Sequence, residues 1–281
     1  MNVIKKGDIV GRISYGKDIF FIVERIIAVE NRKLAILKGV TLRIEADAYL
    51  EDLELIDKDD LEISLRSYDI NLDKRIQKNS EKNATVLEFF EYDRNRNIVV
   101  SHFGKILHLD GDKRYAEKSL KYYKKMKLNA TIKYIPENKQ PKVVYELLNY
   151  YKPDILVITG HDGMIKRNSN YSDLYNYRNS KYFINTVREA RRWASYNKNL
   201  VIFAGACQSY YEALIGAGAN FASSPARILI DFMDPLIVAQ KIAVTDEQKF
   251  LRIEDFSNEL RDGTKGVGGI GANGKKKVIF L

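Results

Sequence analysis

The sequence has few of the residues that form disulfides and metal centres. It contains one cysteine, Cys207, and three histidines among 281 residues. A single cysteine excludes an internal disulfide and a thiolate-rich metal site, and three histidines leave little for a zinc centre. We therefore expect no metal site in this protein.

Long apolar runs are absent as well. No segment approaches the roughly 20 apolar residues that a membrane-spanning helix needs. The first residues, Met1-Asn-Val-Ile-Lys-Lys-Gly-Asp8, lack the apolar stretch of a secretory signal. We expect a cytoplasmic protein that does not bind a membrane.

The charge of the chain is moderately basic. Lys and Arg number 46 against 37 Asp and Glu, which gives a net charge of +9. Such a balance permits nucleic-acid binding or docking on an acidic surface. The sequence has no arginine-rich tract and no nucleic-acid-binding motif, so we attribute the charge to lysines on solvated faces and do not expect a nucleic-acid partner.

Three segments differ in their pattern. Residues 1–57 contain short β-rich runs separated by polar turns, which is typical of a small antiparallel barrel of the SH3-like kind. Residues 58–84 are highly charged with little apolar period and predict a linker or an exposed helix. Residues 85–281 alternate strand and helix patterns, which predicts an α/β domain with a parallel sheet covered on both faces.

Two apolar runs of the third segment end in reactive side chains. The run that begins at Ile155 leads to His161, and the run that begins at Leu200 leads to Cys207, before a helix expected over about 208–217. Neighbouring strands lie about 4.8 Å apart, and open α/β sheets bind ligands at the carboxyl edge of their strands. If the two strands are neighbours, the thiol and the imidazole emerge side by side, so we predict a catalytic dyad.

The chemistry expected of this pair is that of a cysteine hydrolase. Cys207 attacks the scissile carbonyl to give an acyl-enzyme, His161 shuttles protons, and water completes hydrolysis. The first turn of the following helix is expected to lower the thiol pKa. The amide of Cys207 and one from Asp162 or Gly163 are candidate oxyanion donors, and Asp162 is also a candidate to orient His161. This chemistry needs no metal or organic cofactor.

Two cysteine-enzyme architectures place a thiol after a strand. Gly205-Ala-Cys207 is close to the elbow of glutamine amidotransferases, but that family takes its histidine from after the cysteine, and none follows here. The caspase-like fold has an apolar block ending in His-Gly and a later block ending in Ala-Cys. The second block is matched by Ala204-Gly-Ala-Cys207. The first is matched by Thr159-Gly-His-Asp-Gly163, in which one extra residue, Asp162, stands before the glycine. We therefore expect a caspase-like or flavodoxin-like core.

The whole chain resembles the YabG family of sporulation-specific proteases. The resemblance runs from Lys6-Gly-Asp-Ile-Val10 through His108-Leu-Asp-Gly-Asp112 and Gly160-His-Asp-Gly163 to Gly205-Ala-Cys207 and the glycine-rich end. It implies an endopeptidase made in the mother cell and associated with the forming spore coat. It also implies that spore coat and germination-related proteins are its substrates and that cleavage follows basic residues, especially arginine.

Acidic residues are candidates for the pocket of such an arginine. In caspase-like peptidases the end of the first core strand lines this pocket, and here that end carries Asp110 and Asp112. A carboxylate there pairs well with a guanidinium group. The alternative is that these acids form a turn or cap the helix that begins near Lys113. Asp231 and Asp234, which follow the short strand near Phe221, are second candidates.

Two other functions remain open at this point. A non-catalytic module would use the basic barrel to hold nucleic acid or an assembling coat protein. A small-molecule hydrolase or amidotransferase would use a flavodoxin-like sheet, although the missing downstream histidine counts against it. His102 and His108 are weaker candidates for the base, because one precedes the first core strand and the other lies inside it.

Overall fold

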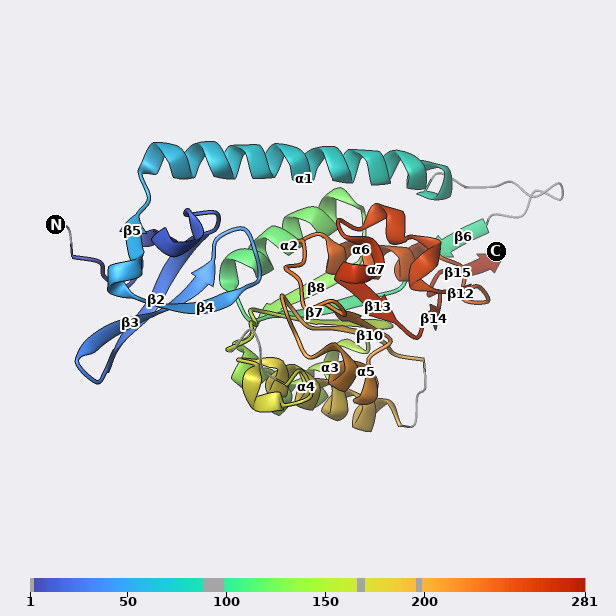
Figure 1. Cartoon of the computed structure of the whole chain (residues 1–281). Helices are drawn as coiled ribbons and strands as arrows, with labels where there is room; N and C mark the ends of the chain where they lie inside the picture. Colours follow the sequence, from blue (N-terminus) through green and yellow to red (C-terminus); the bar gives the residue numbers. More distant parts are fainter. Residues whose placement is uncertain (1–2, 88–98, 166–169, 196–198, 281) are drawn as a thin grey trace.

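The computed structural model describes residues 3–87, 99–165, 170–195 and 199–280. A small antiparallel sheet forms the N-terminal module, and a larger, mostly parallel sheet with helices on both faces forms the rest (Figure 1). A long helix runs from the first part across the second. The expected mixed α/β class is confirmed.

The N-terminal sheet has the order β4-β3-β2-β1-β5, and every neighbouring pair is antiparallel. Its strands are β1 (Ile9–Arg12), β2 (Phe20–Val29), β3 (Arg32–Gly39), β4 (Glu45–Tyr49) and β5 (Leu53–Leu55). Alternation along β2 buries Phe21 and Val23, because successive strand residues point to opposite faces. The same apolar cluster includes Cys207 and Ile230, so the core of the module continues into the larger domain.

The segment expected as a linker or an exposed helix lies within helix α1 (Lys58–Leu87). Leu72 and Ile76 are buried against the larger domain, while most of the described helix surface faces solvent. Arg75 pairs with Asp231 at 2.6 Å and with Asp234 at 3.3 Å. These contacts attach α1 to the larger domain along one side, which an unstructured linker would not do.

The larger sheet has the order β13-β11-β10-β9-β7-β8. Its parallel strands are β7 (Ile106–Asp110), β8 (Ala130–Tyr134), β9 (Ile155–Thr159), β10 (Val201–Ala204) and β11 (Phe221–Ser223), and β13 (Val267–Gly269) adds an antiparallel edge. From β7 the chain adds β8 on one side and then β9 on the other, so the strand order reverses between β7 and β9, which is where doubly wound sheets bind ligands. Residue Ile158 of β9 is opposite Ala204 of β10, so the condition on which the dyad was predicted, that these two strands are neighbours, is met.

Helices cover both faces of this sheet (Figure 1). One apolar cluster packs α2 (Lys113–Lys125) and α6 (Asp234–Val244) on one face, and a second packs α3 (Gln140–Tyr151), α4 (Ser180–Ala194) and α5 (Tyr211–Gly216) on the other. All five residues of β9 are buried, as expected of a strand covered on both sides. This rigid centre holds the ends of β7, β9 and β10 together.

The remaining elements are short. They are α7 (Gly263–Gly266), the pair β6 (Val99–His102) and β15 (Lys277–Phe280), the pair β12 (Phe250–Leu251) and β14 (Ala272–Asn273), and the 3-10 helices η1 (Ile13–Tyr15), η2 (Leu50–Asp52), η3 (Glu137–Lys139), η4 (Leu174–Asn176), η5 (Ile253–Asp255) and η6 (Ser257–Glu259). Among the described residues, no helix is both long and apolar enough to cross a membrane.

Candidate active site

The ends of three neighbouring strands bring the predicted residues together. Asp110 ends β7, His161 follows β9, and Cys207 follows β10. The side chains of all three are fully buried. The N-terminal module covers this edge of the sheet and contributes a residue that the sequence analysis did not single out, Arg43.

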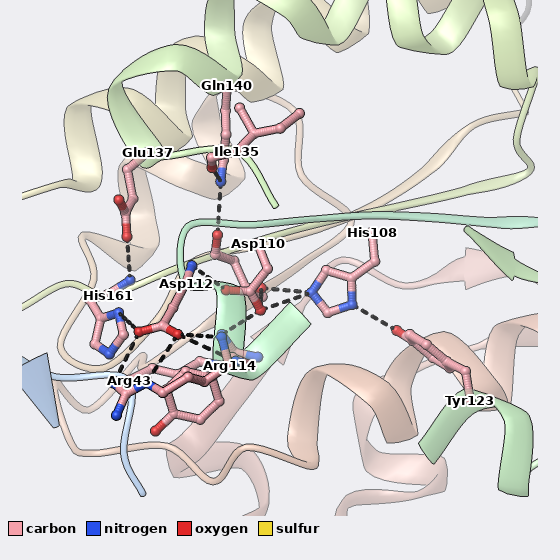
Figure 2. A network of polar contacts seen from close by, with 12 residues as sticks. Arg43, His108, Asp110, Asp112, Arg114, Tyr123, Ile135, Glu137, Gln140 and His161 are labelled. Carbon is pink, nitrogen blue, oxygen red and sulfur yellow. Dashed lines mark hydrogen bonds and ion pairs between the residues drawn. The ribbon is translucent and has the colours of Figure 1, made fainter. Parts of the chain in front are cut away.

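Arg43 lies in the loop that joins β3 to β4, and its side chain enters the larger domain (Figure 2). Its Nη1 donates to Asp110 Oδ2 at 2.7 Å, and both side chains are completely buried. The guanidinium carbon lies 4.5 Å from the centre of the Tyr115 ring. A carboxylate and an aromatic face are the two groups that best hold a desolvated arginine, so this is a built arginine pocket.

The backbone of the same residue lies between the predicted dyad residues. The carbonyl oxygen of Arg43 accepts the amide of Asp162 at 3.2 Å and the amide of Cys207 at 3.3 Å. The next residue, Ile44, forms a parallel bridge with Asp162, and the amide of Glu45 donates to the Asp162 carbonyl at 2.8 Å. One extended peptide segment therefore crosses the site, with its side chain in the pocket and its carbonyl on two amides.

The thiol of Cys207 is not activated in this arrangement. Burial raises its pKa to about 12, although nearby arginines and hydrogen bonds oppose the shift. Sγ contacts the carbonyl oxygen of Ile230 at 3.8 Å. The prediction that a helix start lowers the thiol pKa is wrong, because α5 begins only at Tyr211 and a tight turn with a positive φ at Gln208 separates the two.

The imidazole of His161 is equally enclosed. Burial lowers its pKa to about 4, and the nearby Asp112 carboxylate opposes that shift. Neither ring nitrogen has a hydrogen-bond partner among the described residues. Nδ1 lies 3.9 Å from Asp112 Oδ2, and the ring meets the edge of Tyr115 at 5.5 Å between centroids. The carboxylate nearest the base is therefore that of Asp112.

Asp162 organises the loop after β9 and does not orient His161. Its carboxylate accepts the amides of Gly163 and Asn179 at 2.9 and 2.8 Å, and the hydroxyls of Ser180 and Ser209. The amide of Gly163 is thus engaged and does not bind the carbonyl of Arg43. Gly163 serves a different purpose, since a Cβ at this position would collide with the carbonyl of Glu45 as that segment passes.

The four candidate pocket acids have separate roles. Asp110 binds Arg43 and is supported by Thr159 Oγ1, which donates to Asp110 Oδ2 at 3.0 Å. Asp112 caps α2 by accepting the amides of Arg114 and Tyr115, which is the helix-cap alternative. Asp231 and Asp234 bind Arg75 of α1 instead. Among these four acids, Asp110 is the one that pairs with Arg43.

His108 supports the pocket from within the sheet. Its Nε2 lies 2.7 Å from Thr159 Oγ1, and its Nδ1 lies 3.2 Å from the hydroxyl of Tyr123. Burial lowers its pKa well below the usual value, so the ring is neutral. Because Thr159 donates its proton to Asp110, Nε2 must carry the hydrogen that it donates to Thr159. The predicted packing of His108 in the sheet is confirmed.

The buried Glu137 of η3 was also missed by the sequence analysis. Its Oε1 accepts the amide of His161 at 2.8 Å, which fixes the backbone of the predicted base (Figure 2). Burial raises its pKa to about 7, although Lys38 and this hydrogen bond oppose the shift. A sequence signal existed for Arg43, which is a lone charge in the apolar run Val40-Thr-Leu-Arg-Ile44, but none marked Glu137.

Glu137→Gln is expected to change how stability depends on pH. The folded pKa lies above the unfolded value, so the glutamic acid stabilises the fold most at low pH and this contribution is lost as pH rises through about 7. Glutamine keeps the acceptor and removes the titration. Urea unfolding at pH 5 and pH 8 should show the variant gaining about 2–3 kcal/mol relative to wild type at the higher pH.

Glu146→Gln, on the exposed side of α3, is the matched control and should leave the pH dependence unchanged. Parallel curves for wild type and Glu137→Gln between these pH values would contradict the role given to Glu137.

Comparison with known proteins identifies the family of this chain. A family model described as YabG peptidase U57 matches residues 5–280. The sporulation-specific protease YabG of Bacillus subtilis (strain 168) is 37% identical over an alignment of 292 positions, which covers 97% of this chain and 96% of that protein. No solved structure matches significantly.

The comparisons define a protease. The chain belongs to the YabG peptidase U57 family, the family that the sequence analysis identified.

Proposed function

We propose that this protease is a cysteine endopeptidase that cleaves after arginine through a Cys207–His161 dyad. One observation carries the proposal. The carbonyl of Arg43 accepts the amides of Cys207 and Asp162, and Asp110 binds the side chain of the same arginine. A substrate in the same position would present its scissile carbonyl to the thiol with an arginine before the bond.

The two amides are the proposed oxyanion donors. Both already point at one carbonyl oxygen in a site without exposed surface at Cys207, His161 or Asp162. When the thiolate adds to such a carbonyl, negative charge develops on that oxygen, and preorganised N–H donors stabilise it most strongly where water is excluded. The amide of Gly163, which was an alternative donor, is committed to Asp162.

The proposed primary pocket consists of Asp110, Tyr115 and Phe232. The Arg43 guanidinium pairs with the first and lies over the rings of the other two, at 4.5 and 5.4 Å. A lysine ammonium is a compact point charge that cannot stack in this way, so the pocket favours arginine over lysine.

In the proposed reaction, the Cys207 thiol gives its proton to His161 and the sulfur adds to the scissile carbonyl. The tetrahedral intermediate collapses to an acyl-enzyme as His161 protonates the leaving amine, and a water activated by His161 then hydrolyses the thioester. Glu137 holds the His161 backbone, and the Asp112 carboxylate near Nδ1 favours the imidazolium. His161, assisted by Asp112, thus transfers the proton, and the sulfur of Cys207 attacks the carbonyl carbon.

The family supports the wider assignment. We propose spore coat and germination-related proteins as substrates, and the mother-cell cytoplasm at the forming coat as the place of action. We also propose that the core is caspase-like, because His and Cys follow adjacent parallel strands, and that the N-terminal sheet closes into an SH3-like barrel.

The proposal is tested by labelling with a peptide electrophile. In the Arg43→Ala chain, whose arginine pocket is not filled by Arg43, a short peptide acyloxymethyl ketone ending in arginine should form a thioether at Cys207, whereas the same peptide ending in glutamate should not. Intact mass and peptide mapping locate the adduct. The His161→Ala variant, assayed without label, serves as the control for loss of activity. An adduct at another residue, or equal labelling by the two peptides, would contradict the dyad or the arginine pocket respectively.

A further inference from the structure

One short segment of the N-terminal module fills the arginine pocket and engages both proposed oxyanion donors. We propose that residues Leu42–Glu45 are an internal ligand, bound in the position of a substrate, that keeps the protease latent. This inference rests on the proposed function, because it takes the pocket, the two amides and the dyad to be the catalytic machinery.

The occupation is continuous along the backbone. The side chain of Arg43 fills the arginine pocket, and its carbonyl takes both amide donors. Ile44 then packs in the same apolar cluster as Cys207, and Glu45 pairs with the carbonyl of Asp162. Three successive residues thus make the contacts that the residues on either side of a scissile bond would make, and no second peptide fits while they are present.

The ligand is held firmly and its removal is costly. Arg43 and Asp110 are both fully buried, and separating such a pair leaves an uncompensated charge. Val10, Phe21 and Ile44 of the module share an apolar cluster with Cys207. The thiol is inaccessible because the module covers it, so the same contacts hide the nucleophile and fill the pocket.

The loop is constrained in a way that protects it from its own enzyme. The amide of Gly39 donates to the carbonyl of Ile44 at 2.9 Å, and Lys38 and Glu45 face each other in the β3–β4 pair. Residues on both sides of the Arg43–Ile44 bond are therefore held by one hairpin. If that bond were opened, the new amine would stay beside the acyl-enzyme and re-form the peptide, since the hairpin is preorganised in the bound shape.

The test uses the full-length chain with Arg43→Ala, Arg43→Lys and the control Arg32→Ala. Arg32 belongs to the same module but is exposed and pairs with Glu51. Two rates are measured: cleavage of a fluorogenic peptide with arginine before the reporter, and alkylation of Cys207 by iodoacetamide. Arg43→Ala should raise both at least tenfold, Arg43→Lys should raise both by less, and Arg32→Ala should stay within twofold of wild type.

The outcomes separate the two proposals. Faster alkylation without peptide cleavage would support the internal ligand and overturn the dyad mechanism. If wild type and both Arg43 variants cleave the peptide at the same measurable rate and are alkylated at the same rate, latency is overturned while the mechanism stays intact. Arg43→Lys keeps a charge opposite Asp110, so it decides the matter if Arg43→Ala does not fold. Purified wild type that cuts itself between Arg43 and Ile44 as fast as it cleaves the peptide would also overturn the inhibitory role.

Discussion

Cys207→Ala is expected to lower kcat/KM for an arginine peptide by about a thousandfold or more, the scale on which removal of a catalytic nucleophile acts. The sulfur is the atom that forms the acyl-enzyme in the proposed reaction, and no second cysteine exists to replace it. The comparison is best made in both the wild-type and the Arg43→Ala chains, so that an occupied site does not hide the loss.

The same substitution should have little effect on folding. Cys207 packs as a small apolar side chain in a cluster that includes Ile230 and Phe21, and alanine leaves only a small cavity. Thermal unfolding of the variant therefore serves as the control for the kinetic measurement. Retained cleavage by a fully folded Cys207→Ala protein would remove the thiol from the mechanism and favour another catalytic type.

Asp110→Asn is expected to abolish the preference for arginine. In the proposed pocket this carboxylate alone pairs with the guanidinium, and charged hydrogen bonds in dry sites contribute several kcal/mol. Citrulline has the shape of arginine without the charge. The ratio of kcat/KM values for an arginine and a citrulline peptide should be at least about a hundred in the Arg43→Ala chain, and should fall to a few when Asp110→Asn is added.

Asp231→Asn is the matched control for this experiment. Asp231 was a second candidate by sequence, and it binds Arg75 of α1 and not the arginine of the site. Its substitution should leave the arginine-to-citrulline ratio unchanged even if α1 is held less tightly. A fall in the ratio for Asp231→Asn, with no fall for Asp110→Asn, would show that the specificity pocket is at Asp231 and not at Asp110.

Several features followed from the sequence because they depend on local patterns. Apolar runs of four or five residues ending in glycine and polar residues predicted β9 and β10, and the α/β alternation made them parallel neighbours. That adjacency brought His161 and Cys207 to one edge of the sheet, since parallel strands present their carboxyl ends together. The antiparallel start and the helical alternative for residues 58–84 had the same local origin.

Other features depended on contacts between distant segments. The prediction of a lowered thiol pKa was wrong because it considered only the following helix, whereas the thiol is buried by residues about 160 to 200 positions earlier, such as Phe21 and Ile44. Glu137 reaches His161 across 24 positions, and no motif predicts a contact of that kind. Local pattern determines which elements form, but solvent exposure is decided by what packs over them.

By itself, the sequence determined the fold class, the family and the placement of His161 and Cys207 at neighbouring strand ends, because these depend on periodicity and motif spacing along the chain. It left four acids open for the pocket and did not mark Arg43 for any role. Only the tertiary structure paired Asp110 with Arg43, since burial and ion pairing are properties of assembled surfaces: Arg43 approaches this carboxylate from the loop between β3 and β4, 67 positions away.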